Sequence, residues 1–305
     1  MGCGSFVTAA APAIGPTFGG IMTQYFTWRY IFICVLPVII LASFIGYFCM
    51  SEQIINKHEK FDLLSFIAVA LAFVSLIMGF SNLNQIVDDL VCVLGCFIIG
   101  IISLYYFTKR QLHIKNSLIR IEIFNHKGFT FHTLAIMFLQ MTTLGYGLLL
   151  PTFVQIVLKQ SATDAGIVLL PGAIVGAVFA PIGGLILDRL GAKKPIILGL
   201  CGSFIATFCF LFFFKNLTYQ SCILFYFIYS LGIGLIVGNT MTSAMSHLPK
   251  NLQADGNATL QTLMQLSGGI GTSITATILA FVQQETNLYD GTNRGALFVL
   301  IFFNV

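Results

Sequence analysis

A run without any charged side chain, from Ala165 to Leu187, constrains the fold more than any other stretch of the chain. About 20 apolar residues are enough to cross the hydrocarbon core of a bilayer as a helix. A short turn with several Lys and Arg residues follows, and then a second apolar run, Pro195–Phe214. Because Lys and Arg beside spanning helices are typical of the cytoplasmic side, the two runs predict a pair of transmembrane helices joined by a cytoplasmic turn.

The composition agrees with a membrane protein. Of the 305 residues, 57% are hydrophobic and only 9% are charged, whereas soluble chains carry about 25% charged residues. We therefore expect an all-α polytopic transmembrane bundle. Positively charged cytoplasmic loops account for the net charge of +4, so no nucleic-acid partner is predicted. The cysteines lie almost entirely within apolar runs and form no Cys-x-x-Cys pair, which indicates small buried hydrophobic residues and no metal site.

The remaining apolar runs bring the expected number of helices to about ten. They are Cys3–Phe26, Tyr30–Met50, Leu63–Leu83, Leu90–Phe107, Phe129–Leu158, Ser221–Met245, Ala258–Val282 and a last run from Gly295 to Val305. We expect Pro151 to interrupt the fifth run. The last run is too short to cross about 30 Å of hydrocarbon, so the final helix is expected to be truncated.

The segment Lys109–Lys127 is basic and connects the fourth and fifth runs. Its middle alternates apolar and polar residues, which would suit a short interfacial element. A cytoplasmic linker between two bundles is the interpretation that we favour.

The distribution of basic residues supports this arrangement of helices. With the turn at 188–194 placed in the cytoplasm, the two sides hold very different numbers of Lys and Arg. The cytoplasmic loops hold Lys57, Lys60, Lys109, Arg110, Lys115, Arg120, Lys127, Arg189, Lys193, Lys194 and Lys250, and the outer loops hold Arg29, Lys159, Lys215 and Arg294. One reversed helix would spoil this division, which follows the positive-inside rule.

Small residues and prolines recur every four positions in the first run. One stripe contains Ala11, Gly15 and Gly19, and the next contains Pro12, Pro16 and Gly20. Residues at this spacing share a helix face, and small side chains let a second helix approach closely. We expect Gly15 and Gly19 to pack against another helix. From spacing alone, an ordinary close-packed transmembrane interface explains the pattern equally well.

The same residues resemble motif C, the antiporter motif of the major facilitator superfamily. The matching positions are Gly2, Ala11, Gly15, Pro16, Gly19 and Gly20, with Ala11 standing where the motif has glycine. The basic turn resembles motif A of that superfamily in its second-half copy. Its matching positions are Gly184, Asp188, Arg189, Gly191, Lys193 and Lys194. Further similarity to the fourteen-helix drug–proton antiporter branch lies at Trp28-Arg29, Leu150-Pro151 and Gly268-Gly269.

The resemblance implies a major facilitator fold that lacks its first four helices. The expected division is 1–50 for helices five and six of the N-terminal bundle, 51–108 for an extra helix pair, 109–128 for a cytoplasmic linker and 129–305 for the C-terminal bundle. Motif A is expected to act as a cytoplasmic gate through Asp188, although a role as a topology signal alone remains open.

The function that the resemblance implies is proton-coupled efflux of drugs or other small amphiphilic molecules. It would proceed by alternating access in a bacterial cell membrane that the chain crosses many times. The partners would be the substrate, protons and the lipid bilayer, and the proton gradient would replace any cofactor. Two alternatives stay open: an inactive truncated remnant of such a transporter, and an exporter of an endogenous metabolite with the same fold.

The membrane interior offers polar side chains but no charged ones. The residues that could line a substrate cavity are Gln140, Tyr146, Gln155, Asn239, Gln261 and Gln265. Such residues are also common hydrogen-bonding partners between helices. Intramembrane carboxylates are the usual proton carriers, so proton coupling would need a carboxylate from the missing helices or one at the boundary of a run, such as Asp62. For Asp62, a helix N-cap is the favoured interpretation. No catalytic motif of a soluble enzyme occurs, so no enzyme is expected.

Overall fold

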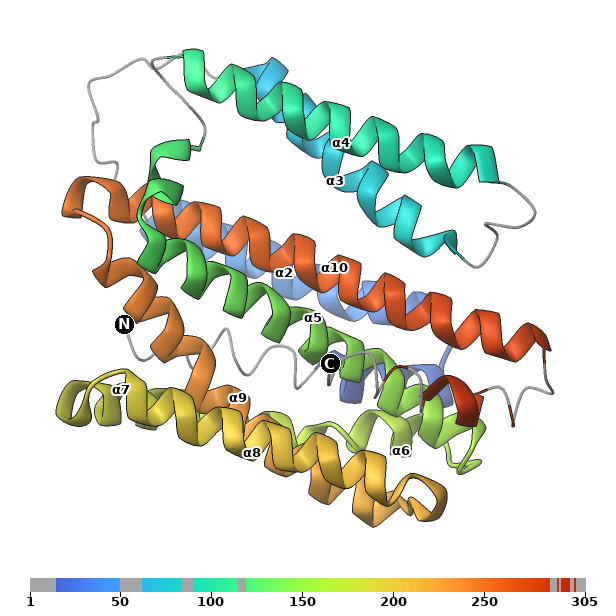
Figure 1. The fold of residues 1–305 in the computed structure, drawn as a ribbon. Helices are drawn as coiled ribbons and strands as arrows, with labels where there is room; N and C mark the ends of the chain where they lie inside the picture. The colour runs from blue at the N-terminus through green and yellow to red at the C-terminus, as the bar shows by residue number, and fades with distance from the viewer. Residues whose placement is uncertain are drawn as a thin grey trace.

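The computed structural model is helical throughout the residues that it describes, which are 15–49, 62–83, 90–114, 119–285, 290, 292–296 and 299. Within them, eight helical spans are long and apolar enough to cross a membrane. The helices run roughly side by side in a bundle, with the green, yellow and orange helices grouped together (Figure 1). This arrangement confirms the polytopic all-α fold.

The helices begin and end near the bounds of the predicted runs. The first described helical segment covers residues 15–25. The others are α2 (Arg29–Cys49), α3 (Leu63–Ser81), α4 (Leu90–His113), α5 (Lys127–Ile156), α6 (Ala162–Ile167), α7 (Leu170–Leu190), α8 (Lys193–Phe212), α9 (Tyr219–Ser246) and α10 (Gln253–Glu285), with short 3-10 turns η2 (Ile121–Asn125), η3 (Phe214–Asn216) and η4 (Lys250–Leu252). Capping boxes at Ser161 and Thr218 start α6 and α9.

The connections divide between the two ends of the bundle. The links from α4 to α5, from α7 to α8 and from α9 to α10 lie at one end, and those from α5 to α6 and from α8 to α9 lie at the other (Figure 1). These are the two groups that the charge distribution assigned to opposite sides. Which end faces the cytoplasm stays a prediction.

Two expectations about the helices are wrong. Pro151 does not interrupt its helix, because α5 continues through it to Ile156. The run from Ala165 to Leu187 is not a single helix either, since α6 ends at Ile167 and α7 begins at Leu170. Pro171 lies in the first turn of α7, where its missing N–H leaves no helical hydrogen bond unmade. The sequence signal for a break was therefore this second proline.

Close contacts between glycines bring the C-terminal helices together. A Cβ atom at Gly199 of α8 would lie 2.6 Å from the carbonyl oxygen of Gly232 on α9, and one at Gly234 would lie 2.5 Å from that of Gly176 on α7. Small residues permit this approach in membrane proteins, where close packing drives the association of helices. Helix α9 thus lies at the centre of a closely packed group with α7 and α8.

The linker after α4 is more than a simple connection. Its η2 turn buries Ile123 completely, in a cluster with Phe129, Ala244 and Leu260 from α5, α9 and α10. Ile123 therefore packs on the end of the bundle, and this burial fixes the linker to the helices that follow it.

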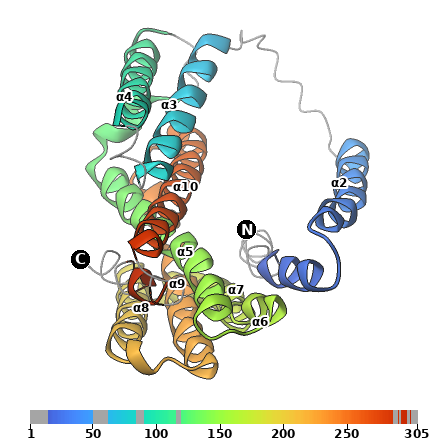
Figure 2. The same cartoon turned by 90° about the vertical axis from the view of Figure 1, so that its right-hand side faces the viewer.

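Helix α2 differs from the others because it has no buried residue. It lies apart from α5 and α10, and the helical segment before it approaches α6 and α7 (Figure 2). Its exposed face includes Phe32, Ile40 and Phe44. A wholly exposed apolar helix is stable in lipid or against further helices.

Candidate functional site

The helical segment 15–25 meets α6 in a close contact near the predicted outer end. A Cβ atom at Gly20 would overlap the carbonyl oxygen of Ala162, and one at Gly166 would lie 2.6 Å from that of Pro16. The Thr17 hydroxyl donates to the Gly166 carbonyl oxygen (3.1 Å), and the backbone N–H of Thr163 donates to Gln24 Oε1 (2.9 Å). Two motif C residues, Pro16 and Gly20, therefore form a contact between segments far apart in the sequence.

The face of this contact differs from the one that the spacing suggested. Gly15 and Gly19 have no atom within 4 Å of the position where a side chain would begin. The expectation that they pack closely is wrong in this chain, and the stripe with Pro16 and Gly20 packs instead. Both stripes have the same four-residue spacing, so periodicity could not choose between them. Gly2 and Ala11 lie outside the described residues.

The turn between α7 and α8 has the backbone geometry that motif A requires. Gly191 ends α7 with a φ of 78°, which is the left-handed region that favours glycine. Lys193 and Lys194 occupy the first turn of α8, where the helix dipole disfavours cations. Their position therefore does not stabilise α8. Gly184 has open space around it and Arg189 is exposed; the side chain of Asp188 is outside the described part.

The six candidates for a substrate cavity do not gather in one place. Tyr146 and Asn239 are buried in the core, and Gln140 is partly buried. The Asn239 Nδ2 donates to the carbonyl oxygen of Leu235 in its own helix (2.7 Å) and lies against Gly183. Asn239 thus has the structural role of an interhelical packing residue.

The three other candidates are exposed. Gln261 and Gln265 lie one turn apart on the same face of α10, and Gln155 lies near the end of α5. Gln261 reaches only the sulfur of Met241 on α9, at 4.0 Å. The pair on α10 therefore lies on the surface of the described helix group.

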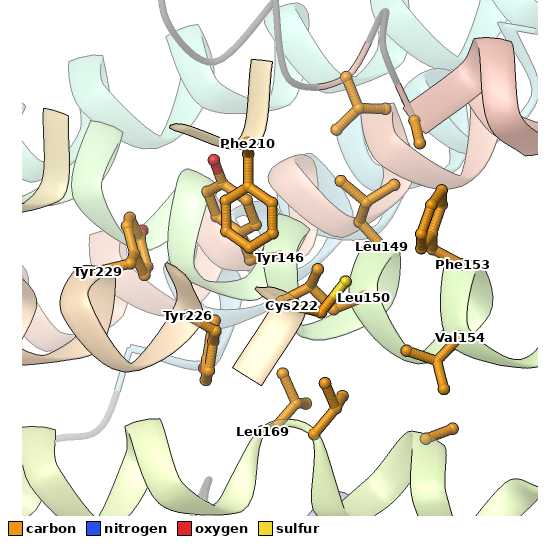
Figure 3. Close-up of a cluster of buried hydrophobic side chains, with 14 of the residues drawn as sticks. Tyr146, Leu149, Leu150, Phe153, Val154, Leu169, Phe210, Cys222, Tyr226 and Tyr229 are labelled. Carbon is orange, nitrogen blue, oxygen red and sulfur yellow. The ribbon is translucent and has the colours of Figure 1, made fainter. Parts of the chain in front are cut away.

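A buried aromatic cluster joins α5, α8 and α9, and no pattern in the sequence predicts it. The rings of Tyr146 and Tyr229 are 4.7 Å apart, and Tyr146 lies 5.7 Å from Phe210 (Figure 3). The Tyr229 hydroxyl contacts the hydroxyls of Thr142 (2.9 Å) and Thr143 (3.2 Å). Both threonines already donate to the Leu139 carbonyl oxygen, so the single proton of the Tyr229 hydroxyl is available to one of the two threonine oxygens at a time.

Tyr146 lacks such a partner. Its buried hydroxyl makes no hydrogen bond among the described residues. Thr207 is near it and donates its own proton to the Ser203 carbonyl oxygen at 2.8 Å. The neighbouring small pocket is lined by apolar side chains such as Leu149, Phe153 and Phe210 (Figure 3). These surroundings suit a packed core and do not form a polar binding site.

Asp62 is the N-cap of α3, as the favoured interpretation expected. Its side chain accepts a hydrogen bond from the Ser65 backbone N–H. It also forms a two-pronged ion pair with Arg110 near the end of α4, with both N···O distances 3.0 Å. Hydrogen bonds from Arg110 and then Ser65 hold the pKa of the Asp62 carboxyl well below its usual range. A carboxyl that stays ionised in this way is a poor proton carrier.

Comparison with known proteins places the chain in a transporter family. Residues 1–272 match the Major Facilitator Superfamily. The lincomycin resistance protein LmrB of Bacillus subtilis is 32% identical over 93% of this chain and 60% of its own length, and that of Listeria monocytogenes is 31% identical over the same shares. The putative multidrug resistance protein MdtD of Klebsiella pneumoniae is 23% identical over 100% of this chain and 65% of its own length.

The chain therefore spans about 60% of the length of the LmrB proteins that it matches. The family match covers the helix with motif C, the turn with motif A and most of α10. Together with the bundle of membrane-spanning helices, it shows that this multi-pass membrane protein belongs to the Major Facilitator Superfamily.

Proposed function

We propose that this chain acts in the proton-coupled efflux of drugs or other small amphiphilic compounds by alternating access. Membership of a transporter family and the drug-resistance names of its relatives support this proposal. The observation that carries it is the contact of segment 15–25 with α6. In alternating access, helices from two halves separate on one side of the membrane while they touch on the other.

The contact between Gly20 and Ala162 supplies the closed side in this proposal. The backbones meet there without side chains between them, which leaves no space between the two helices at this point. The contact lies at the predicted outer end, so the conformation would be open towards the cytoplasm. Separation of the two helices would break the hydrogen bonds of Thr17 and Gln24, and these bonds are few enough for a reversible gate.

The proposed substrate surface is the face of α10 that carries Gln261 and Gln265. Both are exposed and uncharged, and Met241 lies beside Gln261. Amide groups beside a flexible thioether suit compounds that have both polar and apolar parts. Lincomycin, which the LmrB relatives are named for, is the substrate to test first. Gln140, Gln155 and the other candidates have weaker structural support.

Motif A is proposed to act at the opposite end of the cycle. Asp188, Arg189 and Lys193 lie in or beside a turn whose geometry depends on Gly191. In this role they would hold the cytoplasmic side closed during half of the cycle and would not touch the substrate. We expect Asp188→Asn to lower turnover with little change in substrate affinity. A large loss of affinity at normal turnover would contradict this assignment.

The proton is proposed to bind outside the spans described above. Asp62 is engaged by Arg110, and the apolar runs carry no other carboxylate. A carboxylate supplied by the portion of the relatives' length that this chain does not match would fill the role. The exposure of all of α2 favours a second candidate, in which the chain by itself inserts into the membrane but does not transport.

Lincomycin accumulation in a drug-sensitive bacterial strain tests the proposal. Cells that produce the protein should accumulate less lincomycin than cells without it, and a protonophore should abolish the difference. Gln265→Ala should raise the KM for lincomycin severalfold, whereas Gln160→Ala, at an exposed glutamine between α5 and α6, should not. Accumulation unaffected by the protein would favour the second candidate, and export unaffected by a protonophore would refute proton coupling.

A further inference from the structure

We propose that the α3–α4 pair and the following residues 119–126 hold α10 at both ends, and so position Gln261 and Gln265. The residues responsible are Thr277 near one end of α10 and Asp255 at the other. Their role in substrate binding rests on the proposed function, but the mechanical part of the proposal does not. In this view the inserted helix pair is a brace for the helix that carries the substrate surface.

The first anchor joins α10 to the end of α3. The Thr277 hydroxyl donates to the carbonyl oxygen of Phe80 at 2.8 Å and lies 3.4 Å from that of Ser81. The last four carbonyls of a helix have no partner within the helix. Two turns earlier, a Cβ atom at Gly269 would lie 3.0 Å from the side chain of Ile77. Thr277 therefore caps α3, and Gly269 lets it approach.

The second anchor joins α10 to the linker. Arg120 Nε lies 3.2 Å from Asp255 Oδ2. Asp255 is in the first turn of α10, where the helix dipole also favours a carboxylate. Behind this ion pair, Ile123 is completely buried and the Thr130 hydroxyl donates to the Phe124 carbonyl oxygen at 2.9 Å. The linker is thus fixed to the bundle at the point where Arg120 reaches α10.

Further contacts connect the two anchors through the helix pair. The ion pair of Asp62 with Arg110 ties the start of α3 to the end of α4. The Ile119 backbone N–H then donates to Gln111 Oε1 at 3.2 Å, which ties α4 to the linker. The path from Thr277 to Asp255 through α3, α4 and the linker is therefore supported by polar contacts at each junction.

Gln261 and Gln265 lie between the two anchors. Helix α10 rises about 1.5 Å per residue, so Asp255 and Thr277 are about 33 Å apart along it. A helix that one connected unit contacts at both ends resists sliding and tilting relative to that unit. The positions of Gln261 and Gln265 on α10 therefore depend on contacts with α3 and α4, although neither glutamine belongs to these two helices.

Hydrogen–deuterium exchange in detergent tests the brace without any transport measurement. Removal of either anchor, by Thr277→Val or Arg120→Gln, should speed exchange of the peptides around Gln261 and Gln265 at least threefold. Thr272→Val is the matched control, because the Thr272 hydroxyl bonds only to the Gly268 and Gly269 carbonyls of its own helix. Arg120→Asp combined with Asp255→Arg should restore part of the slow exchange, because the ion pair returns while the helix dipole still favours a carboxylate at position 255. Faster exchange confined to the mutated end of α10 would overturn the proposal, because the loss of a purely local contact would speed exchange only there.

Transport kinetics separate the brace from the proposed function. In the protein that exports lincomycin, the anchor variants should raise KM severalfold with a smaller change in kcat, and the charge-reversed pair should recover it. If no form of the protein transports while the exchange differences appear, the proposed function fails and the brace stands. If transport occurs and the anchor variants alter neither exchange nor KM, the brace is refuted and the proposed function stands.

Discussion

At the scale of single residues, Tyr146 and Tyr229 offer a matched pair. Both are buried and their rings touch, but among the residues that the structure describes only the Tyr229 hydroxyl makes hydrogen bonds of normal geometry. We expect Tyr229→Phe to lower the free energy of unfolding by about 1 kcal/mol, as the loss of a hydrogen bond does in proteins and membranes. Tyr146→Phe should be neutral or slightly stabilising, because it removes a buried hydroxyl without a partner. Thermal unfolding in detergent measures both, and equal losses would contradict the assignment.

Asp62 gives a prediction about pH. Its carboxyl pKa is lowered in the folded protein mainly by the hydrogen bond from Arg110, so the ionised form favours folding. The stabilisation is complete above the ordinary pKa of 3.8 and is lost as the pH falls below it towards the lowered value. The melting temperature of the native protein should therefore exceed that of Asp62→Asn by a similar margin from about pH 5 to pH 8. The margin should shrink below pH 3.8. A margin that shrinks near neutral pH would show that Asp62 titrates there.

The residues also show where sequence reasoning succeeds. The N-cap role of Asp62 follows from its position directly before an apolar run, because a cap depends on local chemistry. Its ion pair with Arg110 could not be predicted, since the two are 48 positions apart and belong to different helices. For the same reason, the partners of Tyr229 and Thr277 have no signature in the sequence.

At the scale of helices, the contact between segment 15–25 and α6 can be tested by substitution on its two faces. Gly20→Val should separate the helices because its side chain would overlap Ala162, whereas Gly19→Val adds atoms to open space. A disulfide between cysteines placed at Gln24 and Thr163, which share a hydrogen bond, reports the separation. We expect cross-linking to fall at least fivefold with Gly20→Val and to stay near the native level with Gly19→Val. Equal effects of the two substitutions would contradict the packing described here.

The helix bounds show which features hydropathy can predict and which it cannot. The apolar runs predicted every spanning helix that the structure describes from α2 to α10. They could do so because the hydrophobicity of a segment by itself indicates whether it can span a membrane. Runs cannot show where the backbone changes direction within an apolar stretch. Pro151 is tolerated inside α5, while Pro171 marks the start of α7. Proline is common in the first turn of a helix and rare in its interior, but the residue type alone does not show which of the two prolines begins a helix.

At the scale of the whole molecule, the orientation of the bundle is the simplest prediction to test. Loops assigned to opposite sides lie at opposite ends of the bundle (Figure 1), and their Lys and Arg content differs strongly. Reporter fusions should place Lys193 in the cytoplasm and Lys159 outside. Finding both on the same side would contradict the bundle, whereas the reverse assignment would contradict only the positive-inside argument.

The fold class could be predicted from the sequence, but the candidate site could not. Spans and their order depend on hydropathy, which each segment carries by itself. A substrate surface depends on which helices face one another, and of six polar candidates only Gln261 and Gln265 lie together on an exposed face. The division of the chain at 50, 108 and 128 remains a prediction, since the helix pair and linker contact α10 without showing where a domain ends.

The last prediction concerns the activity of this chain alone. Helix α2 has no buried residue, the apolar runs contain no carboxylate, and the chain matches 60% of the length of LmrB. We therefore expect vesicles that contain only this chain to show no gradient-driven movement of a fluorescent amphiphilic dye. Co-production with the part of LmrB that this chain does not match should give dye movement that an uncoupler abolishes. Transport by the chain alone would mean that α2 already lies against lipid in the active protein, and that a boundary residue such as Asp62 carries the proton after all.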